Sequence, residues 1–214
     1  MRGGDIGRAA LVLGVVAAGF ALAAIASGAE SGKPALAYAA DGSMKAPTDY
    51  RTWVFLSSGV DMSYLEKPGM AGMTMFDNVF ADPAAYAGFL KTGVWPDKTV
   101  LLLEVRKGQR TGSINKHGRF QVGEPIGLEA HVKDVTRFKG GWAFFAFDDK
   151  GRGQLLPQTA ACYACHAANT AVDTTFVQFY PTLLPVAEAK KTLSPAYLAA
   201  RAAEPKQDET PGVD

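Results

Sequence analysis

Between positions 128 and 134 the chain reads Leu128-Glu129-Ala130-His131-Val132-Lys133-Asp134, in which apolar and polar side chains alternate up to Lys133. Successive side chains of a β-strand point to opposite faces of the sheet. The alternation therefore predicts a strand buried on one face only, with Glu129, His131 and Lys133 on the polar face. A sheet with one solvated face is typical of antiparallel strands, because parallel strands are covered on both faces.

Five further segments have the composition of strands, being rich in β-branched and aromatic residues and separated by Gly, Pro and Asn. They span residues 51–57, 74–80, 99–106, 120–122 and 142–147. A helix is predicted over Ala84–Thr92, where Asp82 can cap, Pro83 suits the first position and Gly93 suits the stop. Its helical spacing predicts three core residues, Tyr86, Phe89 and Leu90. The fold class predicted is α+β, mainly an antiparallel β-sheet with a few short helices.

The charge balance excludes one class of partner. The chain has 22 basic and 21 acidic residues and a net charge of +1. A nucleic-acid-binding domain would show a marked excess of basic residues. Nucleic acid is therefore not predicted as a partner.

The two cysteines of the chain both lie in Cys162-Tyr163-Ala164-Cys165-His166. A C-x-x-C-H sequence is typical of c-type haem attachment, in which the two sulfurs bond to the haem and the histidine binds its iron. A structural zinc site needs about four ligands, and no second cysteine pair is present. A thioredoxin-like dithiol would need its own βαβ setting and has no use for the following histidine, so an inert cysteine pair is the alternative. We predict one covalent haem c, held by Cys162, Cys165 and His166 on a short helix over 159–169, with a further helical region after Asp173.

The N-terminus has the pattern of an exported protein. Arg2 and Arg8 precede an uncharged, Ala-rich run over residues 9–26, which resembles a secretory signal. A run of about twenty apolar residues can also cross a bilayer, so an uncleaved anchor stays open. Either arrangement predicts a periplasmic protein. The predicted organisation is 1–30 signal peptide or N-terminal anchor, 31–48 flexible linker, 49–201 haem domain and 202–214 flexible tail.

Several of these stretches together resemble the cytochrome P-460 family, which includes the cytochromes c-prime-beta. They are Trp53–Ser58, Phe76–Phe80, Asp82-Pro83-x-x-Tyr86, Thr92-Gly93-x-Trp95-Pro96-Asp97, Gly127–Asp134, Gly141–Phe144, Cys162–His166 and Phe176–Pro181. The resemblance implies a mainly antiparallel β fold, a five-coordinate c-type haem and a homodimer. It also implies work on a small nitrogen-containing molecule, either hydroxylamine or nitric oxide.

The hydroxylamine-oxidising members of this family carry a lysine bonded to the porphyrin edge. The resemblance places that lysine after Thr92-Gly93, where this chain has Val94. Valine has no nucleophilic nitrogen, so a cross-link would need Lys91 or Lys98 instead. Without the cross-link, an open iron site walled by apolar groups is similar to that of the c-prime-beta proteins, which bind nitric oxide.

Oxidation of hydroxylamine also requires a group that accepts protons. The candidates are Glu124, Glu129, Arg106 and Asp134. We rank Glu124 first, because it lies in the bent stretch Gly123-Glu124-Pro125-Ile126-Gly127. A solvated surface position is the alternative for Glu129.

A second axial ligand would instead make the protein an electron carrier that serves a periplasmic redox partner. His117 is predicted to lie in an exposed turn and His131 on the polar strand face. Met70, Met73 and Met75 form a cluster that could supply a thioether, although gap filling is the usual role of methionine. The primary prediction is redox processing of hydroxylamine or nitric oxide, with nitric oxide binding and electron transfer as alternatives.

Overall fold

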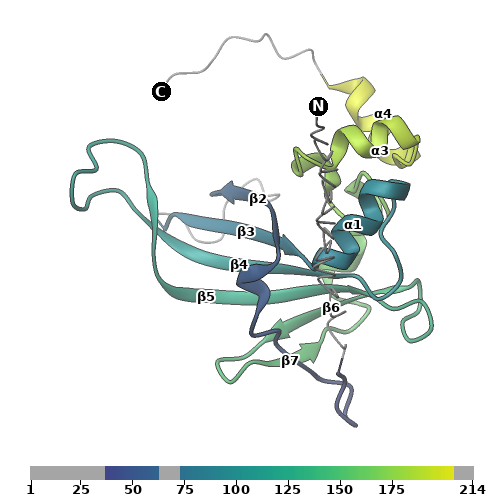
Figure 1. The fold of residues 1–214 in the computed structure, drawn as a ribbon, viewed down its shortest axis with the longest axis horizontal. Helices are drawn as coiled ribbons and strands as arrows, with labels where there is room; N and C mark the ends of the chain where they lie inside the picture. The colour runs from purple at the N-terminus through teal and green to yellow at the C-terminus, as the bar shows by residue number, and fades with distance from the viewer. Residues whose placement is uncertain (1–36, 63–72, 205–214) are drawn as a thin grey trace, which may run out of the picture. The chain divides into compact units, whose positions relative to one another are not determined.

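Within the part of the chain that the structure describes, residues 37–62 and 73–204, seven strands form one antiparallel sheet in the order β1-β7-β6-β5-β4-β3-β2 (Figure 1). The structure is a computed structural model. Its strands are β1 (Met44–Lys45), β2 (Val54–Val60), β3 (Met75–Ala81), β4 (Val100–Gln109), β5 (Phe120–Lys133), β6 (Trp142–Phe147) and β7 (Arg152–Leu155). Its helices are α1 (Pro83–Thr92), α2 (Ala161–Asn169), α3 (Leu184–Lys190) and α4 (Pro195–Ala203), with 3-10 turns η1 (Tyr50–Thr52) and η2 (Val177–Phe179). The α+β class, mainly antiparallel, is confirmed.

The sheet buries apolar side chains on both of its faces. One core cluster joins the sheet residues Leu56, Ala81 and Leu101 to α1, α3 and η2. The other cluster lies on the opposite face, where Leu102, Ala130 and Phe145 occupy one cross-strand row. The prediction that the strand at 128–134 is buried on one face only is therefore wrong in its central part, since Ala130, His131 and Val132 are all buried.

Helix α1 begins and ends where the sequence predicts. The Asp82 side chain accepts a hydrogen bond from the Ala85 amide at 2.8 Å, and Gly93 closes the helix with a φ of 76°. Such a left-handed closing residue favours glycine. Phe89 is fully buried, but Leu90 is 42 % exposed, so the core prediction for Leu90 is wrong.

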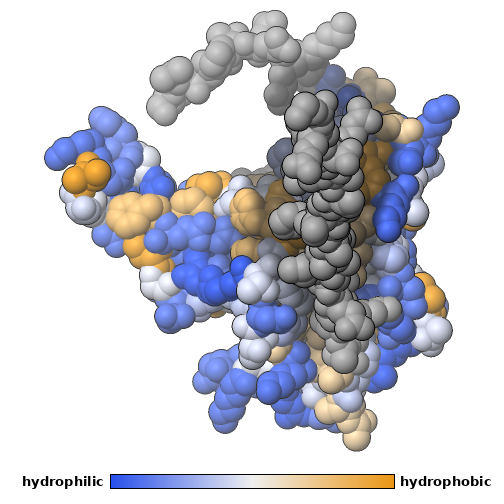
Figure 2. Space-filling view, in the orientation of Figure 1, coloured by the Kyte–Doolittle hydropathy of each residue, from blue (hydrophilic) through white to orange (hydrophobic). Residues whose placement is uncertain are grey.

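Strands β4 and β5 form a long hairpin that extends beyond the rest of the sheet (Figure 1). The sequence predicts strands at 120–122 and 128–134, but the structure joins them into one strand of 14 residues. The surface of the hairpin is largely hydrophilic, with an apolar spot at its end (Figure 2), where Ile114 is 89 % exposed.

Strands β1 and β7, the last two at one end of the sheet, pair with each other and were not predicted. Strand β1 lies inside the segment 31–48 that we predicted to be a linker, and its Met44 is buried. The predicted leader at 1–30 lies outside the described residues, as does the tail from 205 onward. Among the residues that the structure describes, no helix has both the length and the apolar character needed to cross a membrane.

Candidate cofactor site

Helix α2 carries the whole C-x-x-C-H motif. Cys162 and Cys165 lie three positions apart on this helix, so they share one helix face. Both cysteines are half-buried and neither is in a disulfide. The pKa of the Cys162 thiol is raised, chiefly by burial. A redox-active dithiol has the opposite shift, because the thiolate is its reactive form.

The tyrosine inside the motif attaches α2 to the sheet. The Tyr163 hydroxyl accepts a hydrogen bond from the Phe144 amide and donates one to the Leu156 carbonyl, each at 3.2 Å. Its ring also packs edge-on against Phe144, with ring centroids 4.8 Å apart. The two cysteines are thereby placed beside β6.

His166 is held by the segment that follows α2. Its Nδ1 lies 2.7 Å from the carbonyl oxygen of Thr174. A carbonyl only accepts, so Nδ1 carries the proton and the lone pair is on Nε2. Burial lowers the pKa of His166, against the opposing effect of the Thr174 hydrogen bond. The result is a neutral imidazole with one nitrogen ready to bind a metal, an arrangement typical of histidine ligands.

The other histidine at this site, His131, is buried, in contrast to the prediction from the sequence. We predicted His131 on a solvated strand face, but it is only 8 % exposed. Its ring stacks on Phe144 at 4.0 Å between centroids and meets the His166 ring edge-on at 5.1 Å. Its Nε2 lies 3.2 Å from the Thr174 hydroxyl. Burial lowers the pKa of His131 far below its usual value, so this imidazole is neutral too.

A cavity of about 210 Å³ opens beside His166. Its wall is mostly apolar, with sheet residues Val79, Leu101, Leu103 and Phe144 on one side and Phe176, Phe179 and Tyr180 on the other. The polar groups on the wall are few and include Ser57, Asp77, Glu129, His131 and His166. An apolar cavity with a small number of polar groups is typical of a cofactor or ligand site.

Two carboxyl groups reach this cavity from neighbouring parts of the sheet. Partial desolvation raises the pKa of Glu129, and the charge of Asp77 raises it further. The pKa of Asp77 is raised by burial and then by Asp61. Both groups therefore hold a proton more readily than a free carboxyl does. Asp77 was not predicted from the sequence, because nothing in its local pattern marks it.

The remaining predicted acid-base residues lie elsewhere. Glu124 is exposed on the outer half of β5 and is not on the cavity wall, contrary to our ranking. The Arg106 guanidinium hydrogen-bonds to Glu104 at 2.6 Å. Asp134 is paired with Lys98. Of the four candidates only Glu129 faces the cavity.

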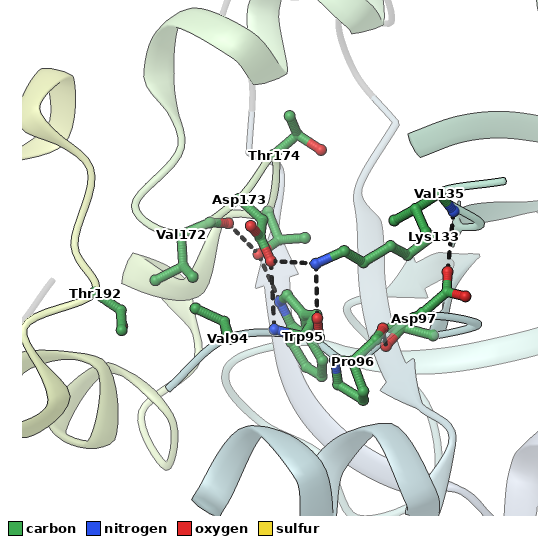
Figure 3. Close-up of polar contacts among 12 residues, drawn as sticks. Val94, Trp95, Pro96, Asp97, Lys133, Val135, Val172, Asp173, Thr174 and Thr192 are labelled. Carbon is green, nitrogen blue, oxygen red and sulfur yellow. Dashed lines mark hydrogen bonds and ion pairs between the residues drawn. The ribbon is translucent and has the colours of Figure 1, made fainter. Parts of the chain in front are cut away.

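The positions discussed for a cross-link also lie away from the cavity wall. Val94 lies in the turn after α1, next to Trp95 (Figure 3), and Lys91 is exposed on α1. Lys98 forms its ion pairs with Asp134 and Asp97. No lysine is among the described residues of the wall.

Neither Met73 nor Met75 of the methionine cluster lies on the described cavity wall. Met70 falls outside the described residues, and Met73 is 41 % exposed. The thioether that lines the cavity belongs to Met62, which the sequence reading did not single out. His117 is exposed in the β4–β5 hairpin, as predicted.

Comparison with known families gives one match. The family model described as Cytochrome P460 matches residues 47–177, more than half of the 214 residues. No curated protein matched the chain.

Proposed function

The chain belongs to the cytochrome P460 family and is a haem-binding cytochrome, and from this premise we propose that Cys162 and Cys165 attach one haem covalently while His166 binds its iron. The observation that carries the proposal is the tautomer of His166. Its Nδ1–H is bonded to the Thr174 carbonyl, so Nε2 is the nitrogen left to bind a metal. The unpaired cysteines precede it on the same helix, and the apolar cavity adjoins it. These residues fit a c-type haem.

The proposed site keeps one side of the iron open for a small molecule. When bound, the haem supplies a redox-active iron with a position for a small ligand. His131 is a poor second ligand, because its Nε2 and the Nδ1 of His166 both bond to Thr174. Two imidazoles that hydrogen-bond to the same residue lie on the same side of the site, so they would not bind the haem iron from opposite faces.

The substrate class we propose is a small nitrogen compound, hydroxylamine or nitric oxide. Nitric oxide suits a mostly apolar wall, since it is weakly hydrated, whereas hydroxylamine needs polar partners there. Glu129 and Asp77 supply the groups that could take up protons released from hydroxylamine. Since Val94, Lys91 and Lys98 are not on the wall, we favour a haem without a lysine cross-link.

The second candidate function is electron transfer with a periplasmic redox partner. The observation that favours it is Met62, whose side chain lines the same cavity. A methionine opposite His166 would fill the open position and convert the site to a six-coordinate electron-transfer centre.

Optical spectra of the full-length protein, produced with a cytochrome c maturation system and reduced with dithionite, test both functions. A high-spin spectrum that changes on addition of nitric oxide supports the open site. A low-spin spectrum that becomes high-spin in Met62→Ala supports electron transfer and contradicts the open site. Colourless protein contradicts haem binding altogether.

Three further measurements test the attachment, the iron ligand and the location. The mass of the haem peptide should equal that of one haem on Cys162 and Cys165, and a cross-link would join it to a second, lysine-containing peptide. His166→Ala should abolish the ligand spectrum, whereas His117→Ala, which changes an exposed histidine of the hairpin, should preserve it. Amino-terminal sequencing of protein from the periplasmic fraction tests export and the fate of the leader.

A further inference from the structure

The segment after α2 makes a tight turn that is held from outside. The amide of Thr175 donates to the Val172 carbonyl at 2.9 Å, so Asp173 and Thr174 form the tip of the turn. Asp173 has a φ of 53°, a conformation that is uncommon for residues other than glycine. A backbone in such a conformation persists where surrounding contacts impose it.

Those contacts come from Lys133 and Trp95 (Figure 3). The Asp173 carboxylate accepts hydrogen bonds from the Lys133 ammonium at 3.0 Å and from the Trp95 amide at 3.3 Å. The same ammonium donates to the Trp95 carbonyl at 2.7 Å. One lysine on β5 thus ties the turn to the loop that precedes β4.

A second bond fixes the other side of the turn. The Trp95 indole N–H donates to the Thr175 hydroxyl at 2.8 Å, and that hydroxyl donates to the Val172 carbonyl at 2.7 Å. Trp95 is 1 % exposed, so its indole cannot move without disturbing the core. The ammonium of Lys133 also lies 5.5 Å from the centroid of the Trp142 ring.

The tip of this turn contacts both imidazoles of the cavity. The Thr174 carbonyl accepts from His166 Nδ1 at 2.7 Å, and the Thr174 hydroxyl lies 3.2 Å from His131 Nε2. A shift of the turn would therefore change the hydrogen bond that sets the tautomer and orientation of His166. Groups that hold a ligating histidine in this way change its basicity toward the metal.

We propose that Lys133 and Asp173 are positioning residues, which hold Thr174 so that its carbonyl keeps a strong hydrogen bond with His166. The proposal rests on the proposed function, in which His166 binds the haem iron. Neither residue lies on the cavity wall, so neither contacts the ligand. Their effect passes through Thr174 to the electron-donating strength of the imidazole.

The test compares three variants of the full-length holoprotein. Lys133→Met removes the hydrogen bond to Asp173 in the turn and the one to the Trp95 carbonyl. Asp173→Asn keeps an oxygen acceptor and a side chain that tolerates a positive φ, so it isolates the loss of charge. Lys98→Met is the matched control, because Lys98 lies in the same region but pairs with Asp134 and Asp97.

The readouts are the iron–histidine stretching band of the reduced protein, by resonance Raman spectroscopy, and the reduction potential. A weaker hydrogen bond makes the imidazole a poorer donor, so both test variants should shift the band to lower wavenumber. A poorer donor stabilises ferric iron less. A change of about tenfold in the relative affinity of the ligand for ferric over ferrous iron would raise the potential by about 59 mV.

The outcomes separate the two proposals. If wild type shows an iron–histidine band and both test variants match Lys98→Met in band position and potential, the positioning role is overturned while the proposed function stands. If wild type shows no such band, the proposed five-coordinate site fails, and the reduction potentials of the three variants then decide the positioning role. Should Lys133→Met not fold, the shift or constancy of the band in Asp173→Asn decides the question.

Discussion

Replacing Glu104 by Gln should cost more stability than any other single loss of charge on the sheet. Glu104 is 1 % exposed and lies on the face of the sheet opposite the cavity. Its carboxylate accepts from the Tyr50 hydroxyl at 2.5 Å, from Arg51 at 2.6 Å and from Arg106 at 2.6 Å. Asn78 supplies a fourth hydrogen bond at 3.2 Å.

The size of the effect follows from these bonds. Hydrogen bonds to a charged group contribute about 1.5–3 kcal/mol each, and an amide keeps one acceptor oxygen but no charge. Removing one member of a buried ion pair costs about 3–5 kcal/mol, because its partner stays buried and unpaired. Arg51 is half exposed and can recover hydration, which lowers the cost. We expect Glu104→Gln to lower the free energy of unfolding by about 2–3 kcal/mol.

Glu188→Gln provides the matched control. Glu188 pairs with Arg201 at 2.5 Å, but both side chains are exposed. An exposed pair contributes about 0–1 kcal/mol, so this variant should lose little. Urea unfolding of both variants and wild type, followed by tryptophan fluorescence, gives the comparison. Equal losses in the two variants would refute the reasoning that burial makes the Glu104 network strong.

The pH dependence supplies an independent check. Burial alone would raise the pKa of Glu104, but hydrogen bonds from Arg106 and Tyr50 outweigh it and lower the pKa below the usual 4.5. The unfolded chain then binds a proton more readily than the folded one. The stability that Glu104 contributes is present above pH 4.5 and is lost as the pH falls through the lowered pKa. The difference in the free energy of unfolding between wild type and Glu104→Gln should therefore become smaller at acidic pH.

Three further predictions concern the site and its frame. Thr174→Val keeps the carbonyl for His166 but removes the hydroxyl at His131, so we expect a loss of about 1 kcal/mol and a melting temperature about 2–4 °C lower, whereas Thr174→Ser should melt like wild type. Asp82→Ala removes the acceptor for the Ala85 and Val100 amides. It should lose about 2 kcal/mol in urea unfolding, and a loss as large in Asp82→Asn would contradict the capping role of the Asp82 oxygen. The pKa of Glu129 is raised, so ionisation of its carboxyl group disfavours the folded state. As the pH rises above 4.5, the free energy of unfolding of Glu129→Gln should therefore increase relative to that of wild type. Parallel pH profiles of the two free energies of unfolding would exclude the raised pKa.

The parts of the fold that depend on local sequence were predicted well. Helix α1 begins after Asp82, whose side-chain oxygen accepts a hydrogen bond from the first turn, and ends at Gly93, which has a positive φ. Both signals act within one turn of the chain. Both ends of strand β6 were predicted correctly, because its run of aromatic residues is typical of a strand whatever the neighbouring strands are. Strand β7, Arg152–Leu155, has no such composition and forms only because β6 and β1 pair with it.

The candidate site was predicted only where the residues form a contiguous motif. Cys162, Cys165 and His166 are read directly from their spacing. The alternation around His131 identifies two faces of a strand but does not tell which face meets water, and here the polar face meets a cavity. Lys133, Asp173 and Thr174 lie far apart in the sequence or in an irregular turn, so only the fold brings them together with His166.

Helix α2 has no buried residue, although it carries the residues on which the proposed function depends. A segment with few packed contacts can open locally at a small fraction of the cost of global unfolding. The two apolar clusters belong to the sheet and to α1, α3 and η2, so they survive such an opening. Such an opening would expose both thiols while the sheet stays folded, so a maturation enzyme could reach them without global unfolding of the chain.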